Sequence, residues 1–316
     1  MDETRSAAAE HGRRLAGAIA VGVGILVVEV VAGVASGSLA LLADAGHMVA
    51  DVSGMALSLG AIWLAGRARP DGRTFGLYRL EILAATVNAV VLLVITAVVI
   101  VEAIRRLPAP PAVESTVVVP VALVVLVANL ASVRLLAHGR HASLTIRGAY
   151  LEALGDLLGA AAVLISGLVI AATGWQPADA IASLLIAALI VPRTLRLLRE
   201  SVDVLLEATP RGVDLATIRG HILDARGVVD VHDLHVWTIT SGMNVVSAHV
   251  VMEDEAQPGD ILDELGRCLS DDFDIDHSTF QLETSDHVRW EATKPARGAD
   301  PVPAEPTAEL PPGSSA

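Results

Sequence analysis

Four side chains that can bind a metal ion occur as two equally spaced pairs inside very apolar segments. His47 and Asp51 lie four residues apart in LADAGHMVAD, and Glu152 and Asp156 lie four apart in AYLEALGDLLG. Residues four apart share one face of an α-helix, so the members of each pair project together. One imidazole and three carboxylates from two helices could form a four-ligand tetrahedral site, which suits a divalent transition metal and zinc above all.

A structural role is the alternative interpretation of these residues. A single polar residue in an apolar helix usually pairs with a neighbour in the bundle. Asp44 lies on the same side of its helix as His47, whereas Glu29 and Asn88 each stand alone and could equally make a packing hydrogen bond or face the same cavity. Two matching pairs, with no Lys or Arg expected nearby to neutralise them, favour a metal ion.

The segments that carry these pairs are long enough to cross a membrane. The chain has 316 residues, is 53% hydrophobic and has a mean hydropathy of +0.57, whereas soluble proteins are about 45–50% apolar. A membrane-spanning helix needs about 20 mostly apolar residues. Six segments meet this requirement and predict a helical membrane domain over residues 15–199: 15–35, 39–65, 80–104, 113–137, 149–173 and 177–197.

The arginines indicate the orientation in the membrane. Short cytoplasmic loops of membrane proteins are enriched in Lys and Arg. If the N-terminus (residues 1–14) is cytoplasmic, the outer loops carry only Arg105 and Arg106, and every other arginine of the membrane part lies on the inner side. The sequence therefore predicts a multi-pass protein of the cell membrane, inner or plasma, with both termini in the cytoplasm.

A soluble domain begins at about residue 200. Residues 200–316 hold 23 acidic and 7 basic residues, a balance that argues against a nucleic-acid partner and for cations. Helices are expected at 212–225, with Asp214 as N-cap, and at 258–273, and strands at 228–240, 245–252 and 277–284. The order αββαβ predicts a three-stranded sheet with two helices on one face, over residues 200–290. The Pro- and Ala-rich tail, 291–316, is expected to be disordered.

The predicted strands carry a second group of possible ligands. His232 and His235 are three apart on one strand and are expected to point to opposite faces. A site built from His232, His249 on the paired strand and a residue of the third strand, Glu283 foremost, is feasible, with His277 as a further candidate. The alternative is that these side chains only pack or cap.

Two further polar residues carry narrower expectations. Cys268 is the only cysteine, so no intramolecular disulfide is possible, and a zinc–thiolate site is not expected. Asp179, at the start of the sixth apolar segment, is expected to cap a helix.

These motifs resemble the cation diffusion facilitator family, in its bacterial zinc, cadmium and cobalt resistance branch. The resemblance covers residues 15–285 and is carried by SGSLALLADAGHMVAD, TFGLYRLEILAATVNAV, RGAYLEALGDLLG, GWQPADAIAS, VHDLHVW and HSTFQLE. It implies six transmembrane helices, a ferredoxin-like cytoplasmic domain for dimerisation and metal sensing, and a homodimer. It also implies export of Zn²⁺ in exchange for protons, with Zn²⁺ as a regulatory ion. The transport site of the family falls on His47, Asp51, Glu152 and Asp156.

The chain departs from the family pattern at two places. Zinc-transporting members commonly carry His at the position of Glu152, and a carboxylate there hardens the site and adds negative charge. Cd²⁺, Co²⁺, Fe²⁺ or Mn²⁺ are therefore alternative cargoes. The loop RARPDGRTFG offers only Asp71 where some relatives hold a metal ion, so no metal is expected in that loop.

The expected function is proton-coupled metal export, which is secondary transport and not enzymatic catalysis. One rival is a metal sensor, in which the membrane part only anchors the acidic domain. A cation channel is the second rival, although a four-ligand cage binds an ion too tightly for fast conduction. A hydrolytic enzyme is disfavoured because the sequence offers neither a nucleophile–base pair nor a phosphate-binding loop.

Overall fold

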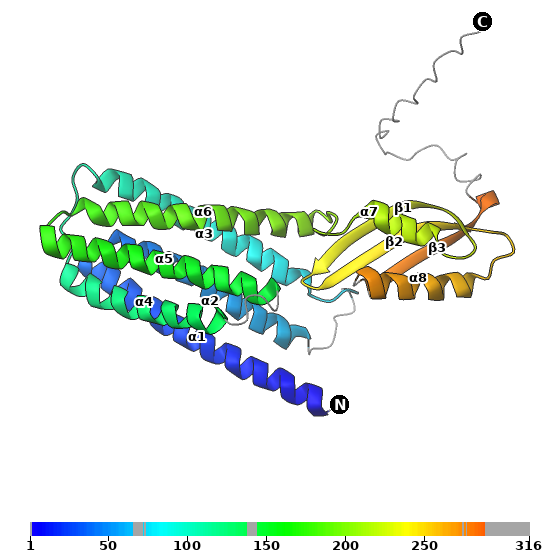
Figure 1. Ribbon diagram of the computed structural model, residues 1–316, viewed down its shortest axis with the longest axis horizontal. Helices are drawn as coiled ribbons and strands as arrows, with labels where there is room; N and C mark the ends of the chain where they lie inside the picture. Colours follow the sequence, from blue (N-terminus) through cyan, green and yellow to red (C-terminus); the bar gives the residue numbers. More distant parts are fainter. Residues whose placement is uncertain are drawn as a thin grey trace, which may run out of the picture. The chain divides into compact units, whose positions relative to one another are not determined.

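Six long helices form the first of two compact units. A computed structural model describes residues 2–65, 72, 74–137, 144–273, 275 and 277–287 of the chain. The helices of the first unit run alongside one another (Figure 1): α1 (Asp2–Ser36), α2 (Leu39–Ala65), α3 (Arg79–Arg106), α4 (Ser115–Ala137), α5 (Leu144–Thr173) and α6 (Pro177–Leu205). The six predicted helices are all present, and α6 continues to Leu205, past the predicted domain boundary at residue 199.

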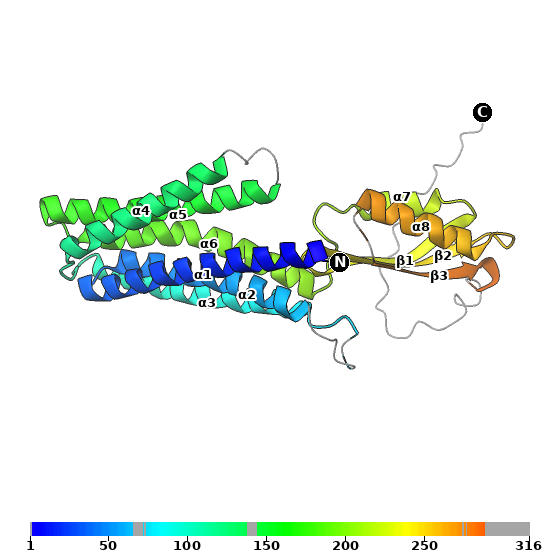
Figure 2. The same cartoon turned by 90° about the horizontal axis from the view of Figure 1, so that it is seen from below.

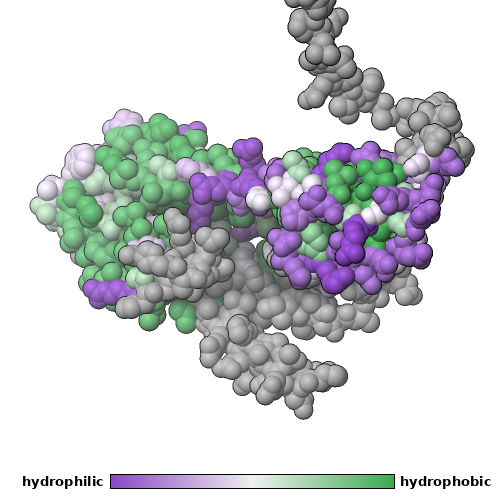
Figure 3. All heavy atoms as spheres, turned by 45° about the vertical axis from the view of Figure 1, so that its right-hand side comes forward, coloured by the Kyte–Doolittle hydropathy of each residue, from purple (hydrophilic) through white to green (hydrophobic). Residues whose placement is uncertain are grey.

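Five of the described helices are long and apolar enough to cross a membrane: Ile19–Ser36, Arg79–Arg106, Ser115–Ala137, Tyr150–Thr173 and Pro177–Leu205. The helix that does not join them, α2, carries Asp44, His47 and Asp51. The face of this unit that Figure 3 shows is largely hydrophobic. Exposed apolar side chains of the unit include Val31 and Val98. A helical membrane domain is thus confirmed, whereas the sixth span stays a prediction.

Small residues let the helices approach closely. The main neighbours are α4 with α5, α3 with α6, and α1 with α2. Ala40 and Ala103 are fully buried in the core of this unit. A Cβ atom on Gly33 of α1 would lie 2.8 Å from Cδ2 of Leu42 in α2, so the glycine leaves space for the Leu42 side chain against the α1 backbone. Small residues at helix contacts are typical of membrane bundles.

Asp179 in the first turn of α6 caps α2. Its carboxylate accepts hydrogen bonds from the Ser38 hydroxyl (2.5 Å) and from the backbone N–H groups of Leu39 (2.7 Å) and Ala40 (3.4 Å). The expected capping role is confirmed, but the capped helix is a different one. A carboxylate at a helix N-terminus satisfies free N–H groups and complements the helix dipole. These three hydrogen bonds also hold α2, with its polar residues, against α6.

The second unit is a small α/β domain. Its elements follow the predicted order αββαβ: α7 (Leu215–Leu223), β1 (Val228–Thr240), β2 (Met243–Met252), α8 (Pro258–Phe273) and β3 (His277–Thr284). The strand order is β1-β2-β3, with β3 parallel to β2. Both helices cover the same face of the sheet, as Figure 2 shows, and the core between them includes Ile218, Leu265 and Val250.

Asp214 begins α7 as predicted. Its carboxylate accepts hydrogen bonds from the backbone N–H groups of Ala216 and Thr217, both at 3.2 Å. The Thr217 hydroxyl also donates to it at 2.6 Å. These bonds, the one from the hydroxyl foremost, hold the pKa of the Asp214 carboxyl below its usual value. The charged carboxylate is therefore the form that starts the helix.

A bulge in β1 changes the direction of its side chains. Asp233 has a positive φ of 47°. Val231 and Leu234 both pack in the core of the domain, although strict alternation would place residues three apart on opposite faces. An extra residue at Asp233 shifts the alternation, as a β-bulge does. His232 and His235 therefore share one face, and the expectation that they point to opposite faces is wrong.

Candidate metal sites

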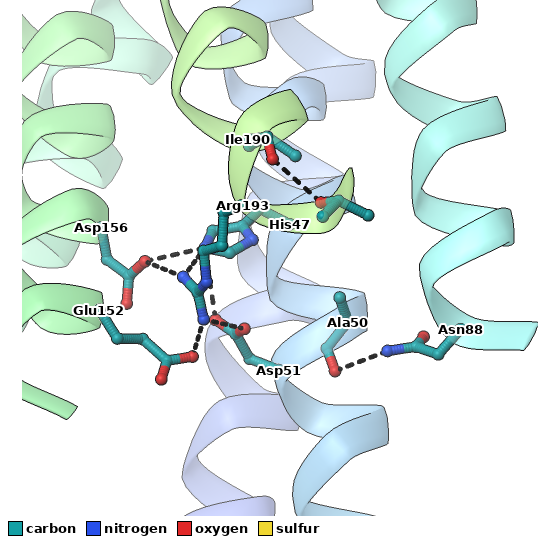
Figure 4. Close-up of polar contacts among 9 residues, drawn as sticks. His47, Ala50, Asp51, Asn88, Glu152, Asp156, Ile190 and Arg193 are labelled. Carbon is teal, nitrogen blue, oxygen red and sulfur yellow. Dashed lines mark hydrogen bonds and ion pairs between the residues drawn. The ribbon is translucent and has the colours of Figure 1, made fainter. Parts of the chain in front are cut away.

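Three of the four residues predicted in the apolar helices come together in the helical unit. Nε2 of His47 lies 2.8 Å from Oδ1 of Asp156 and 3.7 Å from Oδ2 of Asp51. One ligand atom from each of the three lies within 4.8 Å of the others. We call His47, Asp51 and Asp156 the helix cluster (Figure 4). The i, i+4 spacing on α2 brings its two members to the facing side of α5, as the sequence predicts.

Glu152, the fourth predicted ligand, does not join the helix cluster. Its side chain is 44% exposed, whereas those of Asp51 and Asp156 are each 21% exposed. Its carboxylate instead pairs with the guanidinium of Arg193 from α6. The helical spacing places Glu152 one turn from Asp156, but an arginine stands between its carboxylate and the other ligands (Figure 4).

Arg193 contradicts the expectation that no basic residue lies nearby. Its Nη2 atom is 3.9 Å from Oδ1 of Asp51, and its Nη1 atom is 3.9 Å from Oδ1 of Asp156. Nη1 also lies 3.4 Å from Nε2 of His47. Arginine carries a planar and always protonated guanidinium that can contact several carboxylates at once. One guanidinium therefore contacts all four residues that the sequence predicts as ligands.

The sequence contains a signal that would have found Arg193. As one of the arginines assigned to the cytoplasmic side, Arg193 looks like a residue at the end of the sixth apolar segment. However, α6 continues for three more turns, to Leu205. Arg193 is one turn from Ile190, which is buried, and Ile190 and Arg193 line the same cavity as the helix cluster. The 3.6-residue period of α6 thus places Arg193 on its inner face.

The formal charge of the four predicted ligands, taken together with Arg193, fits a divalent ion. With ionised carboxylates and a neutral imidazole, Asp51, Glu152 and Asp156 carry a charge of −3. The guanidinium of Arg193 changes this sum to −2, which one divalent cation balances. A cation that enters the group therefore meets both attraction from the carboxylates and repulsion from the arginine.

The three other polar residues predicted in the helices differ in whether they line the cavity beside the helix cluster. Asn88 of α3 lines the cavity and also donates a hydrogen bond to the carbonyl oxygen of Ala50 at 3.2 Å, so both of its predicted roles hold. Glu29 is fully buried, and Asp44 is 8% exposed. Neither of these two carboxylates is among the residues that line the cavity.

A second group of ligands forms on the sheet as predicted. Nε2 of His232 lies 3.2 Å from Oε2 of Glu283, and Nδ1 of His249 lies 2.8 Å from Oε1 of the same carboxylate. The two imidazole rings are 5.0 Å apart. We call His232, His249 and Glu283 the strand cluster. It lies on the sheet face opposite α7 and α8, because Ala248 and Val250 on either side of His249 pack toward those helices.

Pairing between β2 and β3 explains the geometry of the strand cluster. His249 is opposite Gln281, so Glu283 is its diagonal neighbour. The Glu283 side chain is 1% exposed, and the amide of Gln281 donates to its Oε1 at 2.6 Å. This hydrogen bond orients the carboxylate toward the two imidazoles. His277, the further candidate, is exposed at the start of β3 and lies outside the group.

The two helices of the sheet domain bring together a third group that was not predicted. His221 of α7 faces Cys268 and Asp272 of α8. We call these three residues the thiol cluster. Partial burial of the Cys268 thiol, and next the neighbouring Asp272 carboxylate, raise the pKa of that thiol. Only the i, i+4 spacing of Cys268 and Asp272 is visible in the sequence, because His221 is 47 residues away.

Two predictions fall on residues outside the described part of the chain. One is the absence of a metal ion at Asp71, in the loop after α2, and the other is the disorder of the tail, 291–316.

Residues 15–206 match the cation efflux transmembrane domain, and residues 210–285 match the cytoplasmic domain of cation efflux proteins. The chain belongs to the cation efflux family. The family resemblance inferred from the motifs is thereby confirmed, together with a multi-pass membrane part and a cytoplasmic C-terminal domain. Membership also agrees with a transporter and not with an enzyme.

Several curated members of the cation efflux family are similar over most of their length. The metal cation efflux system protein CzcD of Cupriavidus metallidurans is 44% identical over 82% of both chains. The zinc transporter ZitB of Escherichia coli is 40% identical over 86% of this chain and 88% of its own. The cadmium, cobalt and zinc/H(+)-K(+) antiporter of Bacillus subtilis is 36% identical over 84% of this chain and 86% of its own.

Proposed function

We propose that this protein exports Zn²⁺ from the cytoplasm across the cell membrane in exchange for protons. The observation that carries the proposal is the convergence of His47, Asp51 and Asp156 beside a cavity in the helical unit. The names of the relatives, which cite zinc, cadmium, cobalt and proton antiport, support the same cargo and coupling. Cd²⁺ and Co²⁺ are proposed as further cargoes, and Fe²⁺ and Mn²⁺ are alternatives that Glu152 makes chemically reasonable.

Shared lone pairs explain the exchange of metal for protons. The imidazole nitrogen of His47 and the carboxylate oxygens of Asp51 and Asp156 can each bind either a proton or the metal ion. Imidazole is the side chain that gains and loses a proton most readily near neutral pH. When the cavity opens to the cytoplasm, the deprotonated ligands bind Zn²⁺. When it opens to the other side, protons occupy the same atoms and the metal ion leaves.

Arg193 has a defined part in this cycle. Its guanidinium contacts the carboxylates that bind the cargo, so Arg193 and the metal ion compete for the same negative charge. Glu152 becomes available as a fourth ligand when the metal ion displaces the guanidinium. The return of Arg193 to the carboxylates then favours release. A transport site must bind strongly enough to capture and weakly enough to release, and an internal cation meets both needs.

The membrane topology and assembly are part of the proposal. We include α2 as the sixth span, because its polar residues contact α5 and α6 and would not face lipid. The cytoplasmic domain, residues 200–290, is proposed as the dimer contact of a homodimer. The strand cluster is proposed to bind regulatory Zn²⁺, because its two imidazoles and one buried carboxylate are suitable zinc ligands.

Transport by purified protein in lipid vesicles tests this function. Vesicles that contain a metal-sensitive dye and a pH dye are exposed to Zn²⁺, Cd²⁺, Co²⁺, Mn²⁺ and Fe²⁺ in turn. The proposal predicts zinc entry coupled to proton movement in the opposite direction. Metal entry without proton movement would indicate a channel. Absence of entry for every ion, with protein correctly inserted, would indicate a membrane-anchored sensor.

A further inference from the structure

The thiol cluster has the spacing of a metal site. Nδ1 of His221 lies 3.3 Å from Sγ of Cys268 and 3.6 Å from Oδ2 of Asp272, and the sulfur lies 3.7 Å from the same carboxylate oxygen. A tetrahedral Zn²⁺ with bonds of about 2.0–2.3 Å holds its ligand atoms about 3.3–3.6 Å apart. The three atoms are therefore close to the separations that a single zinc ion requires.

The surroundings hold these side chains in place and leave them open to solvent. Cys268 and Asp272 are one turn apart on α8, so they project from the same face toward α7. The ring of Phe273 meets the His221 imidazole edge to face, with centroids 5.0 Å apart and planes at 85°. The His221 side chain is 40% exposed and that of Asp272 is 56% exposed. Solvent can therefore reach the site and supply a fourth ligand.

We propose that His221, Cys268 and Asp272 bind a soft divalent metal ion, Zn²⁺ or Cd²⁺, with water as the fourth ligand. Thiolate and imidazole are ligands that favour these ions over Mn²⁺ and Mg²⁺. On binding, the thiol releases its proton to solvent, and the thiolate forms the bond to the metal. The proposal differs from the expectation that one cysteine makes no zinc–thiolate site, because imidazole and carboxylate would complete the ligand set.

The thiol cluster is a different site from the strand cluster. The thiol cluster is built by α7 and α8, whereas the strand cluster lies on the opposite face of the sheet. Each could therefore bind an ion without displacing the other. The proposal does not depend on transport, because all three ligands belong to the cytoplasmic domain. A domain with two sites can respond to metal over a wider concentration range than a domain with one.

The single cysteine makes the test specific. Purified full-length protein in detergent, kept reduced and stripped of metal, is titrated with Co²⁺ while the near-ultraviolet absorption is recorded. Only a cobalt–thiolate bond gives an intense charge-transfer band in that region, and only Cys268 can provide the thiolate. We expect the band to saturate at an absorption that corresponds to a single cobalt–thiolate bond per chain and to disappear on addition of Zn²⁺ or Cd²⁺, which replace the cobalt.

Variants separate a built site from a lone thiol. His221→Gln and Asp272→Asn should each weaken Co²⁺ binding by at least about tenfold, the usual minimum for a lost metal-site contact. His235→Ala, an exposed residue of β1, and the double variant His232→Ala/His249→Ala should leave the intensity of the band at saturating Co²⁺ unchanged. Binding is compared only for variants whose melting temperature equals that of the wild-type protein. No band with wild-type protein, or a band that His221→Gln and Asp272→Asn do not weaken, overturns the proposal.

Discussion

The helix cluster and the strand cluster use the same two ligand types but differ in what balances their charge. In the helix cluster, two carboxylates and one imidazole meet the guanidinium of Arg193. In the strand cluster, the carboxylate of Glu283 meets two imidazoles and the amide of Gln281. One group is therefore balanced by a permanent cation, and the other by neutral or titratable partners.

This difference suggests how one protein could use metal ions in two ways. A permanent cation competes with a metal ion for carboxylate oxygens, which keeps residence short and suits a cargo that must leave. Imidazoles and an orienting amide do not compete in this way, because they are themselves ligands or hold the ligand in place. A regulatory ion can then remain bound.

The largest effect is expected from loss of a carboxylate in the helix cluster. Asp51→Asn and Asp156→Asn each remove a charged ligand with little change in volume, so zinc transport in vesicles should fall to the background of empty vesicles. Glu255→Gln removes a charge from an exposed turn of the cytoplasmic domain and should transport at the wild-type rate. Near-normal zinc uptake by either aspartate variant would mean that the cargo binds elsewhere.

Removal of the competing cation should separate affinity from turnover. Arg193→Gln should bind zinc roughly tenfold more tightly, which corresponds to about 1.4 kcal/mol, and should transport it more slowly. Competition with a zinc-binding dye measures the affinity, and vesicle uptake measures the rate. Arg199→Gln, an exposed residue of the same helix, is the control. Unchanged or weaker zinc binding by Arg193→Gln would show that the guanidinium does not compete with the cargo.

A change of ligand at residue 152 should shift the choice of ion. Glu152→His replaces a hard oxygen by a softer nitrogen, so transport should favour Zn²⁺ and Cd²⁺ more strongly over Mn²⁺ and Fe²⁺. It also leaves Arg193 without its closest carboxylate partner. The ratio of Mn²⁺ to Zn²⁺ uptake in the same vesicles measures the effect. If that ratio stays constant or rises, residue 152 does not determine selectivity.

The smallest effect on transport is expected from the strand cluster. His232→Ala/His249→Ala should raise the zinc concentration at which transport becomes half-maximal and should keep the rate at saturating zinc within about twofold, an effect of under 1 kcal/mol. Uptake measured over a range of zinc concentrations shows both quantities. Loss of transport at every concentration would give the strand cluster a direct part in moving the cargo.

Local patterns in the sequence predict most of the fold. The apolar segments give six helices, and alternation gives strands at 228–240 and 277–284 with the bounds that the structure has. The i, i+4 spacing also brings His47 and Asp51 to one face, and pairing of adjacent strands brings His249 near Glu283. These results depend on short-range periodicity, which a single sequence contains in full.

Other features depend on contacts between distant segments. Asp179 is recognisable as a capping residue, but its partner helix is set by packing 140 residues away. Asp233 looks like any strand residue, and only its positive φ reveals the bulge. Arg193 lies four residues from the predicted end of its segment, and its long side chain extends to α2 and α5. The period of α6 places Arg193 on its inner face, but the residues of α2 and α5 that it contacts carry no signal at short sequence spacing.

The most direct test of the account is whether a proton gradient alone moves zinc. Vesicles that contain the protein receive equal concentrations of zinc inside and outside, and a pH difference is then imposed across the membrane. If protons and zinc share His47, Asp51 and Asp156, wild-type protein should drive zinc toward the more acidic side, and Asp156→Asn should not. A zinc distribution that ignores the pH difference, or an equal response from Asp156→Asn, would contradict the account.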